Sequence, residues 1–325
     1  MEDFIQHKVF LEAKKLGIDI NLDSLKKHHS QGYISQVFFA TSNVGDIIIH
    51  LIKLNGAQEH IHVSDKIQPL LDELLQYKNI PLPKIYASFS LEPYSIFISK
   101  FLIGSQAGSR SYDGDSDFAD HYTIPFEKIE DELEKIIYNI HYSFRPKKFG
   151  WILGEDIKRG GSFSSWVEFL ESEISLWKDK ITDGESKINF TKTNLANRLY
   201  AYFNSIKSNI NYSDQPVLVH GDLTNPSNIL VDKNKISGII DWEYGLAGDP
   251  AWEFVFKSKF SLKTYFYLLK EKGISVDESW FLQRTHDYYP LMCGLWCFVH
   301  SFDPHSVLYG VCRRHLDKIL KTYGF

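Results

Sequence analysis

Hydrophobic and polar positions in the first third of the chain follow two β-type runs and then one helix-type run. Directly after Gly32, the segment YISQVFFATSNVGDIIIHLIKL predicts two strands that a turn at residues 42–46 joins into a hairpin. Another apolar run, YSIFISKFLIG at residues 94–104, predicts a further strand. Between them, residues 63–78 predict a helix that ends at the sequence IPLP, because apolar side chains recur on one side, at Ile67, Leu70, Leu71, Leu74 and Leu75.

The remainder of the chain changes in character. Residues 105–125 are polar and predict a loop or lid, and helical spacing dominates beyond them. A hairpin predicted at residues 217–240 interrupts these helices, which are expected over residues 129–143, 165–178, 194–210 and 252–272 and from 280 to the end. The pattern therefore predicts an α+β protein. Its β-rich first part should meet the helical second part near residues 99–104, with a ligand cleft between the two.

Composition narrows the range of partners. The 325 residues are 43% hydrophobic and 24% charged, which is typical of a globular protein, and the net charge of −5 leaves no basic field for a nucleic acid. The charged opening MEDFIQHKVF lacks the apolar run of a signal peptide, and no segment reaches the roughly 18 uncharged apolar residues of a membrane span. A cytoplasmic protein without a membrane partner is therefore expected. Three cysteines are too few for a disulfide framework, and no pattern defines an oligomeric state.

The side chains best suited to catalysis or metal binding lie in the segment HGDLTNPSNILVDKNKISGIIDWE, residues 220–243. If Val231 pairs with Ile236 across the turn at 232–235, Asn228 lies opposite Ile239 and Asp241 falls just beyond that pair, near the loop that Asp222 begins. Two carboxylates and an amide oxygen would then converge. Such hard oxygen donors suit Mg²⁺, and a second carboxylate can accept the proton of an attacking hydroxyl, which are the two requirements of phosphoryl transfer.

The motifs HGDL, NILVD, ISGIIDWE and GDPAWE, in this order over residues 220–253, resemble the signature of aminoglycoside phosphotransferases and choline-kinase-like enzymes. The resemblance implies a two-lobed, protein-kinase-like fold, with a nucleotide-binding N-lobe at 1–103 and a C-lobe at 104–325 that carries the catalytic loop and binds the acceptor. It also implies that Asp222 is the catalytic base and that His220 braces its loop. Asn228 and Asp241 would hold Mg²⁺.

Weaker similarity suggests where a nucleotide binds. The stretch SQGYISQVFFA, with Gly32 and Ser35, is similar to the family's phosphate-covering loop, and YSIFISKFLIG, with Lys100 and Phe101, is similar to its adenine-binding hinge. ATP is the expected donor of the phosphoryl group, and GTP is the alternative.

The chain departs from the family at the phosphate-binding strand. The position of the usual Lys or Arg holds His50, and Lys53 follows three residues later. Their odd separation puts the two side chains on opposite faces of a strand, and spacing from Gly32 favours His50. Gln68 stands near the position of the family's orienting Glu.

A second departure lies in the catalytic loop. The family usually places five positions between its catalytic Asp and its metal-binding Asn, whereas Asp222 and Asn228 are six apart, so Asn225 is an alternative ligand. These departures keep a second function open, a nucleotide-dependent binding or regulatory protein without transfer activity. Nothing in the sequence identifies the acceptor.

Other polar residues have structural interpretations. Asp249 precedes a proline and is expected to cap the next helix, while Glu253 could support the structure or face the substrate. His60 and His62 are expected to be exposed, and the acidic run at 113–117 lacks the glycine and the glutamate of a calcium loop. The cysteines at 293 and 297 are expected to pack in a core.

Overall fold

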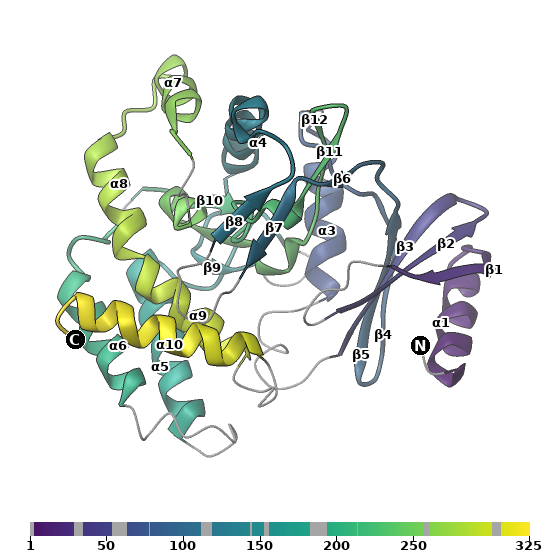
Figure 1. Cartoon of the computed structure of the whole chain (residues 1–325), viewed down its shortest axis with the longest axis horizontal. Helices are drawn as coiled ribbons and strands as arrows, with labels where there is room; N and C mark the ends of the chain where they lie inside the picture. The colour runs from purple at the N-terminus through teal and green to yellow at the C-terminus, as the bar shows by residue number, and fades with distance from the viewer. Residues whose placement is uncertain are drawn as a thin grey trace.

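A computed structural model of the chain describes residues 3–28, 35–53, 64–77, 79–111, 119–143, 145–152, 156–182, 194–212, 214–256, 260–300 and 307–325. Gly32, His60, His62 and the acidic run at 113–117 lie outside these ranges. Within them, the N-terminal region is sheet-rich and the C-terminal region is largely helical, as predicted (Figure 1).

Within the described residues, the N-terminal region is a five-stranded antiparallel sheet in the order β1-β2-β3-β5-β4, with one helix packed on each face. The predicted hairpin is present, since Ser42 pairs with Gly45 at its turn. Its elements are α1 (Asp3–Lys15), β1 (Ile20–Lys27), β2 (Ser35–Ser42), β3 (Gly45–Lys53), α3 (Ser64–Leu74), β4 (Ile85–Leu91) and β5 (Tyr94–Lys100).

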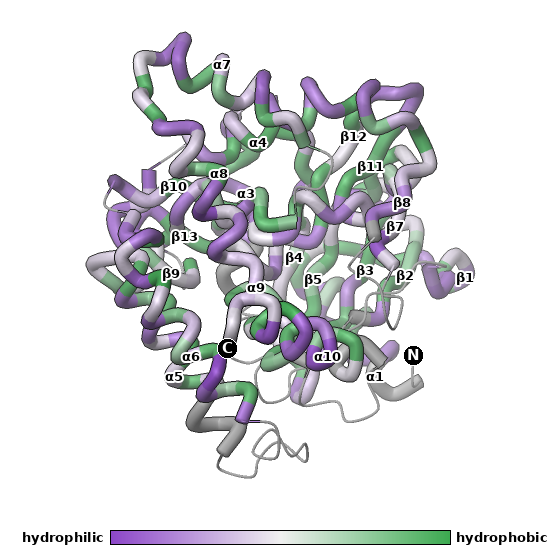
Figure 2. Tube along the Cα trace, turned by 60° about the vertical axis from the view of Figure 1, so that its left-hand side comes forward, coloured by the Kyte–Doolittle hydropathy of each residue, from purple (hydrophilic) through white to green (hydrophobic). Residues whose placement is uncertain are grey.

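Strict alternation along β3 sends its side chains to two different cores. Ile47, Ile49 and Leu51 pack on the side of α1, whereas Ile52 packs with Leu70 of α3 in a larger cluster that continues into the C-terminal region. The two regions therefore share one apolar core. The apolar strands of this sheet stand out in green in Figure 2.

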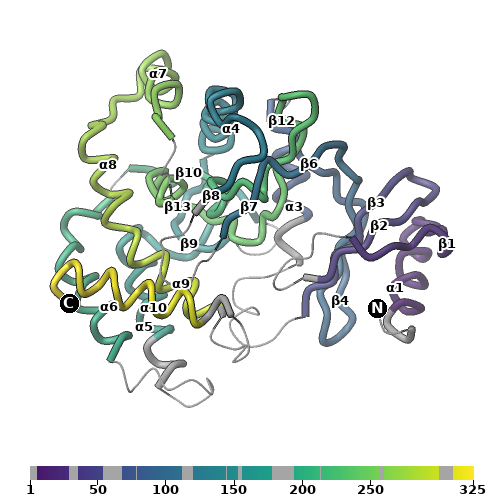
Figure 3. The backbone as a smooth tube through the Cα atoms, in the orientation of Figure 1, coloured from purple at the N-terminus to yellow at the C-terminus, as the bar shows by residue number. Residues whose placement is uncertain are grey.

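The C-terminal region packs helices around three small β-units, with α9 buried among them. Figure 3 shows the chain passing through this region after β5 and ending beside α6. Its helices are α4 (Glu130–Ser143), α5 (Trp166–Thr182), α6 (Leu195–Ile206), α7 (Lys263–Glu271), α8 (Glu278–Asp287), α9 (Tyr289–His300) and α10 (Val307–Thr322). Its strands are β6 (Ser105–Gln106), β7 (Gly108–Ser111), β8 (Ala119–Tyr122), β9 (Gly150–Trp151), β10 (Val217–Val219), β11 (Ile229–Asp232), β12 (Lys235–Ile239) and β13 (Leu246–Gly248).

Three predictions of secondary structure are wrong here. The expected loop at 105–125 contains β6 and a β7–β8 hairpin. Strand β10 pairs with β13 and not with β11, so only β11 and β12 form the predicted hairpin. The helix expected at 252–272 is a short 3₁₀ helix, Pro250–Phe254, followed by α7, and the segment from 280 onward forms three helices. The apolar spacing in these segments reports burial correctly but does not mark where the backbone turns.

The remaining helices and the cysteines agree with the sequence. Helices α4, α5 and α6 lie where they were expected. Cys293, Cys297 and Cys312 are free and buried. No helix within the described ranges has the length and hydrophobicity to cross a membrane.

Candidate active site

The loop that follows β10 carries the HGDL motif in a backbone path that requires glycine. Gly221 has φ +88°, and a Cβ atom there would lie 2.7 Å from the carbonyl oxygen of Tyr244. The chain then turns through Asp222 into a 3₁₀ helix, Pro226–Asn228, before β11 begins. This tight turn places Asp222 and Asn228 side by side.

His220 braces this loop through both nitrogens of its ring. Its Nε2 atom donates to the carbonyl oxygen of Ile240 at 2.9 Å, and its Nδ1 atom accepts from the backbone N–H of Asp222 at 3.3 Å. Burial lowers the pKa of His220, against the charge of Glu253, so the ring is neutral and can serve as donor and acceptor at once. Because both nitrogens bind backbone, His220 holds the loop in shape.

Glu253 fixes the same loop from the opposite side. Its carboxylate accepts from the backbone N–H groups of His220 at 2.7 Å, Gly221 at 3.3 Å and Leu223 at 3.0 Å. Burial alone would raise the pKa of Glu253, but the adjacent His141 ring and the backbone N–H of Leu223 hold the pKa of this carboxyl below the ordinary value. The sequence allows Glu253 either to support the structure or to face the substrate, and these hydrogen bonds favour the structural role.

Asp249 is a helix cap, as predicted. Its side chain accepts from the backbone N–H of Ala251 at 2.9 Å, at the start of the 3₁₀ helix that carries Glu253. It also pairs with Arg284 at 2.6 Å and accepts from the hydroxyl of Tyr288 at 2.6 Å. This buried set fixes the segment from which Glu253 reaches the loop that carries Asp222.

The Asp222 carboxylate is buried and accepts three hydrogen bonds. Oδ2 accepts from the side-chain amides of Asn225 and Asn228, each at 3.0 Å, and Oδ1 accepts from the guanidinium of Arg110 at 3.2 Å. Burial raises the pKa of Asp222 to about 7 and the charge of Asp241 adds to this, whereas Arg110 and the two amides lower it. A carboxylate whose pKa lies near neutrality is well suited to take up and release a proton.

The extra position in the loop is accommodated at Asn225. Its backbone is extended, with φ −76° and ψ 117°, as expected for a residue before proline. The side chain does not bulge outward, because it is 8% exposed and turns toward Asp222. Asn225 and Asn228 therefore both donate to the Asp222 carboxylate. The side-chain amide of Asn228 also donates to the backbone carbonyl oxygen of Asp222 at 2.9 Å.

Asp241 lies next to this cluster, although the predicted register is off by one residue. Ile229 faces Ile239 because of an irregularity after Leu230, and the backbone N–H of Ile240 donates to the carbonyl oxygen of Asn228 at 3.0 Å. Asp241 follows with φ 69°. Its side chain is accessible to solvent, yet the surrounding protein displaces enough water to raise its pKa to about 6.

The donor set can be compared with the needs of a metal ion. Among the described residues, the Asp241 carboxylate has no hydrogen-bond or ion-pair partner, which leaves its oxygens available. The Nδ2 atom of Asn228 is committed to Asp222, so its amide oxygen is the atom left for a cation. Within the described ranges, no group of three or more His, Cys, Asp and Glu is arranged so that it could hold a metal ion by itself. This sparse oxygen set fits Mg²⁺, which keeps waters and phosphate oxygens as its other ligands.

His50 and Lys53 lie on opposite faces of β3, as their spacing predicts. His50 stacks on Phe97 of β5, with ring centroids 4.1 Å apart, on the face that packs toward α3 and the C-terminal region. Burial and the charge of His28 lower the pKa of His50 to about 3. Lys53 is exposed on the other face. His50 thus lies on the face toward the C-terminal region with a neutral ring, and its contact with phosphates stays a prediction.

The other residues predicted for the nucleotide are less closely grouped. Ser35 begins β2 and Lys100 ends β5, where Lys100 is exposed. Phe101 packs edge-on against Phe39, and its backbone N–H donates to the carbonyl oxygen of Asp46 at 3.0 Å. That N–H is therefore committed to the sheet. Contact of these residues with a nucleotide stays a prediction.

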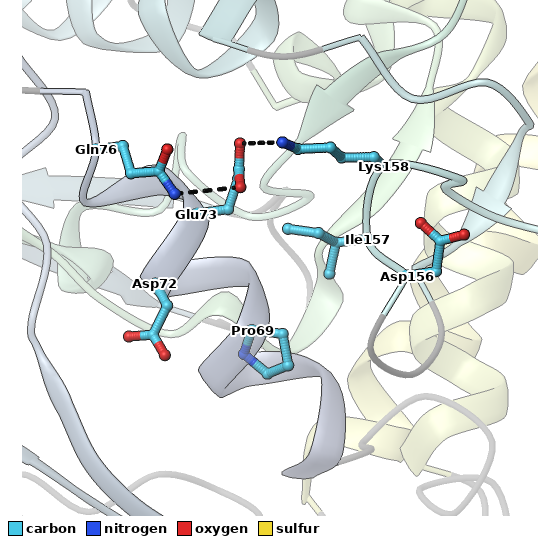
Figure 4. A pocket seen from close by; sticks show the side chains of 7 residues that line it. All are labelled: Pro69, Asp72, Glu73, Gln76, Asp156, Ile157 and Lys158. Atoms are coloured by element: carbon cyan, nitrogen blue, oxygen red, sulfur yellow. Dashed lines mark hydrogen bonds and ion pairs between the residues drawn. The ribbon is translucent and has the colours of Figure 1, made fainter.

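A pocket of about 270 Å³ lies between α3 and the turn at 156–158. Figure 4 shows Glu73 between Gln76 and Lys158, whose ammonium lies 3.2 Å from the Glu73 carboxylate. None of the predicted site residues lines this pocket, which is instead lined by Pro69, Asp72, Glu73, Gln76, Asp156, Ile157 and Lys158. The pocket therefore lies at the junction of the two regions and apart from the Asp222 loop.

Sequence reasoning missed Arg110 and Asp120, which lie within the segment read as a loop. They face each other across the β7–β8 hairpin, and Arg110 also reaches Asp222. The strands GSRS and ADHY are short and poor in β-branched residues, so propensity gives little signal for them. Only the ten-residue separation of two opposite charges in a polar segment hints at the pair.

Comparison with known proteins bears on this geometry. A family model described as the phosphotransferase enzyme family matches residues 174–260, which contain Asp222, Asn228, Asp241 and Glu253. A search of curated protein sequences finds no match.

Solved structures match almost the whole chain. A thermostable mutant of aminoglycoside phosphotransferase APH(4)-Ia, in complex with ADP and hygromycin B, is 14% identical, with a TM-score of 0.64 over 96% of this chain and 97% of that one. The GDP and kanamycin complex of APH(2")-IIia is 16% identical, with a TM-score of 0.63 over 98% and 99%. Macrolide 2'-phosphotransferase MphH from Brachybacterium faecium is 17% identical, with a TM-score of 0.57 over 92% and 98%.

These likenesses confirm the predicted kinase-like fold and the resemblance to aminoglycoside phosphotransferases. The family match over residues 174–260 agrees with this likeness and covers the loop that carries Asp222.

Proposed function

We propose that this protein transfers the γ-phosphoryl group of ATP, with Mg²⁺, to a hydroxyl group of a small molecule. The observation that carries the proposal is the Asp222 carboxylate, buried and held by three donors beside the accessible carboxylate of Asp241. A positioned acid or base of this kind contributes a factor of about 10²–10⁴ to rate. Nucleotide complexes of the structurally similar phosphotransferases support nucleotide binding here.

In the proposed step, the acceptor hydroxyl lies against Asp222 and its oxygen attacks the γ-phosphorus. The bond from the γ-phosphorus to the bridging oxygen breaks, nucleoside diphosphate leaves, and the hydroxyl proton moves to Asp222. His220 and Glu253 hold the loop that presents this carboxylate. Asn228 and Asp241 would hold Mg²⁺, which when bound neutralises negative charge on the phosphate oxygens.

His50 is proposed to approach the phosphates as a neutral hydrogen-bond donor, because burial keeps its pKa near 3. Gly32 and Ser35 would cover the phosphates, and Lys100 and Phe101 would border the base. The proposed lobe boundary, between 103 and 104, follows the end of β5. Cytoplasmic location remains part of the proposal.

A screen of small hydroxyl compounds tests this function. Purified protein with Mg²⁺ and ATP, and separately with GTP, is incubated with aminoglycosides such as kanamycin and hygromycin B, a macrolide, amino alcohols and sugars. Nucleotide consumption is then measured against a control without acceptor. At least one compound should raise consumption above that control and gain a phosphate by mass spectrometry. Tight nucleotide binding without any acceptor-dependent turnover would instead support the binding or regulatory alternative.

A further inference from the structure

Arg110 is brought to the catalytic loop by the β7–β8 hairpin, which crosses the C-terminal region in front of β9 and β10 in Figure 1. Its Nη1 atom lies 3.2 Å from Oδ1 of Asp222. The side chains of Arg110 and Asp222 are only 1% and 6% exposed. A charge so deeply buried requires partners, and this contact is one of them.

The hairpin also fixes the orientation of the guanidinium group. Arg110 and Asp120 face each other directly in the β7–β8 ladder, and the Asp120 carboxylate accepts from Nε at 2.7 Å and from Nη2 at 3.2 Å. The ring of Phe256 packs against the guanidinium group, with its centroid 4.8 Å from Cζ. A two-point ion pair and an aromatic face leave the guanidinium plane little freedom, so Nη1 has a defined direction toward Asp222.

The donors around Asp222 distinguish its two oxygens. An ionised carboxylate oxygen can accept about two hydrogen bonds. Oδ2 already accepts from Asn225 and Asn228, whereas Oδ1 accepts only from Arg110. Oδ1 therefore keeps one acceptor position, and the acceptor hydroxyl would have to use it. Arg110 donates to that same oxygen and so sets the direction in which the remaining position points.

We propose that Arg110 is a positioning residue, clamped by Asp120, that orients Oδ1 of Asp222 toward the acceptor hydroxyl. The inference rests on the proposed phosphoryl transfer, in which the hydroxyl O–H bond breaks, its proton moves to Oδ1, and the oxygen binds the γ-phosphorus as nucleoside diphosphate leaves. Arg110 itself gains and loses no proton. It differs from Asn225 and Asn228 because it comes from outside the catalytic loop.

The experiment compares wild-type protein with Arg110→Ala, Arg110→Lys and Asp120→Asn. The control is Arg198→Ala, which removes an arginine that pairs with Asp317 on helix α10, apart from the catalytic loop. The probe is Mg²⁺–ATP with the best compound of the acceptor screen, or with water as acceptor if slow hydrolysis is the only turnover. For each variant, kcat, KM for ATP and the melting temperature are measured.

We expect Arg110→Ala to lower kcat by about tenfold to 100-fold, because a misdirected base loses much of the advantage of alignment, and to change KM for ATP less than twofold. Tens of millimolar guanidinium should restore part of kcat in Arg110→Ala and none in Asp222→Asn. Arg110→Lys should have a kcat close to that of Arg110→Ala, since an ammonium group cannot donate to Asp120 and Asp222 in the geometry of a guanidinium group. The kcat of Asp120→Asn should lie between those of wild type and Arg110→Ala. The kcat and the KM for ATP of Arg198→Ala should match those of wild type.

An unchanged kcat in folded Arg110→Ala, or a higher KM for ATP at constant kcat, would overturn the proposal. If Arg110→Ala does not fold, Asp120→Asn and Arg110→Lys decide by the same split between kcat and KM.

If wild type consumes no nucleotide, the proposed function fails on its own. Side-chain NMR of isotope-labelled arginines then tests the contact. Asp222→Asn should shift the Arg110 signals and leave those of Arg198 in place, and unmoved Arg110 signals would refute the contact.

Discussion

The loop that carries Asp222 and strand β3 are two segments in which the sequence predicts site residues, and they are built in different ways. In the loop, the backbone N–H groups of residues 220, 221 and 223 donate to one buried carboxylate, and Asp222 accepts from three side chains. On β3, His50 stacks on an aromatic ring and is flanked by apolar side chains. One segment is held by directed polar contacts, and the other by a sheet ladder and its apolar packing.

This difference predicts how each segment responds to substitution. Directed hydrogen bonds in a buried loop fail sharply, because a lost partner leaves a polar group without water. A strand keeps its geometry when one side chain changes, because the ladder is made by the backbone. Substitutions in the loop should therefore have large effects on rate or stability, and substitutions on β3 should have small ones.

The largest expected effect is that of Asp222→Asn. Turnover should fall by about 10² or more, since the proton acceptor is lost, while nucleotide binding and the melting temperature stay close to wild type. Steady-state kinetics with the screened acceptor and calorimetric titration of nucleotide measure the two quantities. A folded variant with near-normal turnover would show that another group accepts the proton.

Glu253→Ala should be the most destabilising change. The substitution leaves three buried N–H groups without an acceptor. Each unpaired group costs about 1–3 kcal/mol, so the free energy of unfolding should fall by about 3 kcal/mol or more. Glu253→Gln keeps one oxygen and should lose less. Urea unfolding measures both, with Glu171→Ala as control, because Glu171 pairs with Lys207 at a partly exposed site and should cost under about 1 kcal/mol. Equal losses in Glu253→Ala and Glu171→Ala would contradict the bracing role.

Substitutions at the proposed metal ligands should separate metal binding from orientation of the base. Asp241→Ala removes a charged ligand and should raise the Mg²⁺ concentration for half-maximal turnover most, and Asn228→Ala should raise it less. Asn225→Ala should lower turnover at saturating Mg²⁺ without raising that concentration, because its amide contacts Asp222. Mg²⁺ titrations of the three variants test this order. A metal defect in Asn225→Ala alone would reassign the ligand.

The smallest effect is expected at His50. Because its pKa is about 3, the ring is neutral between pH 6 and 8, and nucleotide affinity should not depend on its titration in that range. His50→Ala should weaken binding only several-fold, and Lys53→Ala should not weaken it. Affinity that rises as pH falls from 8 to 6, and loses this trend in His50→Ala, would show that bound phosphates protonate the ring.

The low pKa of His50 also has a consequence for stability. A histidine whose folded pKa lies below its unfolded value near 6.5 stabilises the fold fully only above pH 6.5. As pH falls below that value, the unfolded chain takes up the proton first, so His50 should contribute a loss of up to about 1.4 kcal/mol per pH unit. Unfolding of wild type and His50→Gln at pH 7.5 and 5.5 measures the difference.

The sequence predicts the parts of this molecule that are local. The hairpin of β2 and β3, helix α3 and the Asp222–Asn228–Asp241 cluster follow from periodicity and motif spacing over short separations. Pairing of β10 with β13 joins residues about 30 apart, and the contact of Arg110 with Asp222 spans 112 positions. Such contacts depend on how the chain folds back, and no periodicity in one segment encodes its distant partner.

Two ion pairs described above should respond differently to ionic strength. Lys158 is 63% exposed where it meets Glu73 of α3, so its attraction is screened once the Debye length shortens to a few ångströms near 1 M salt. The Arg110–Asp222 pair is shielded from mobile ions by its burial. Raising salt would thus weaken the Lys158–Glu73 contact while leaving the Arg110–Asp222 pair and the shared apolar core in place. A salt series therefore separates the contribution of this exposed contact to stability from that of the buried pair at Asp222.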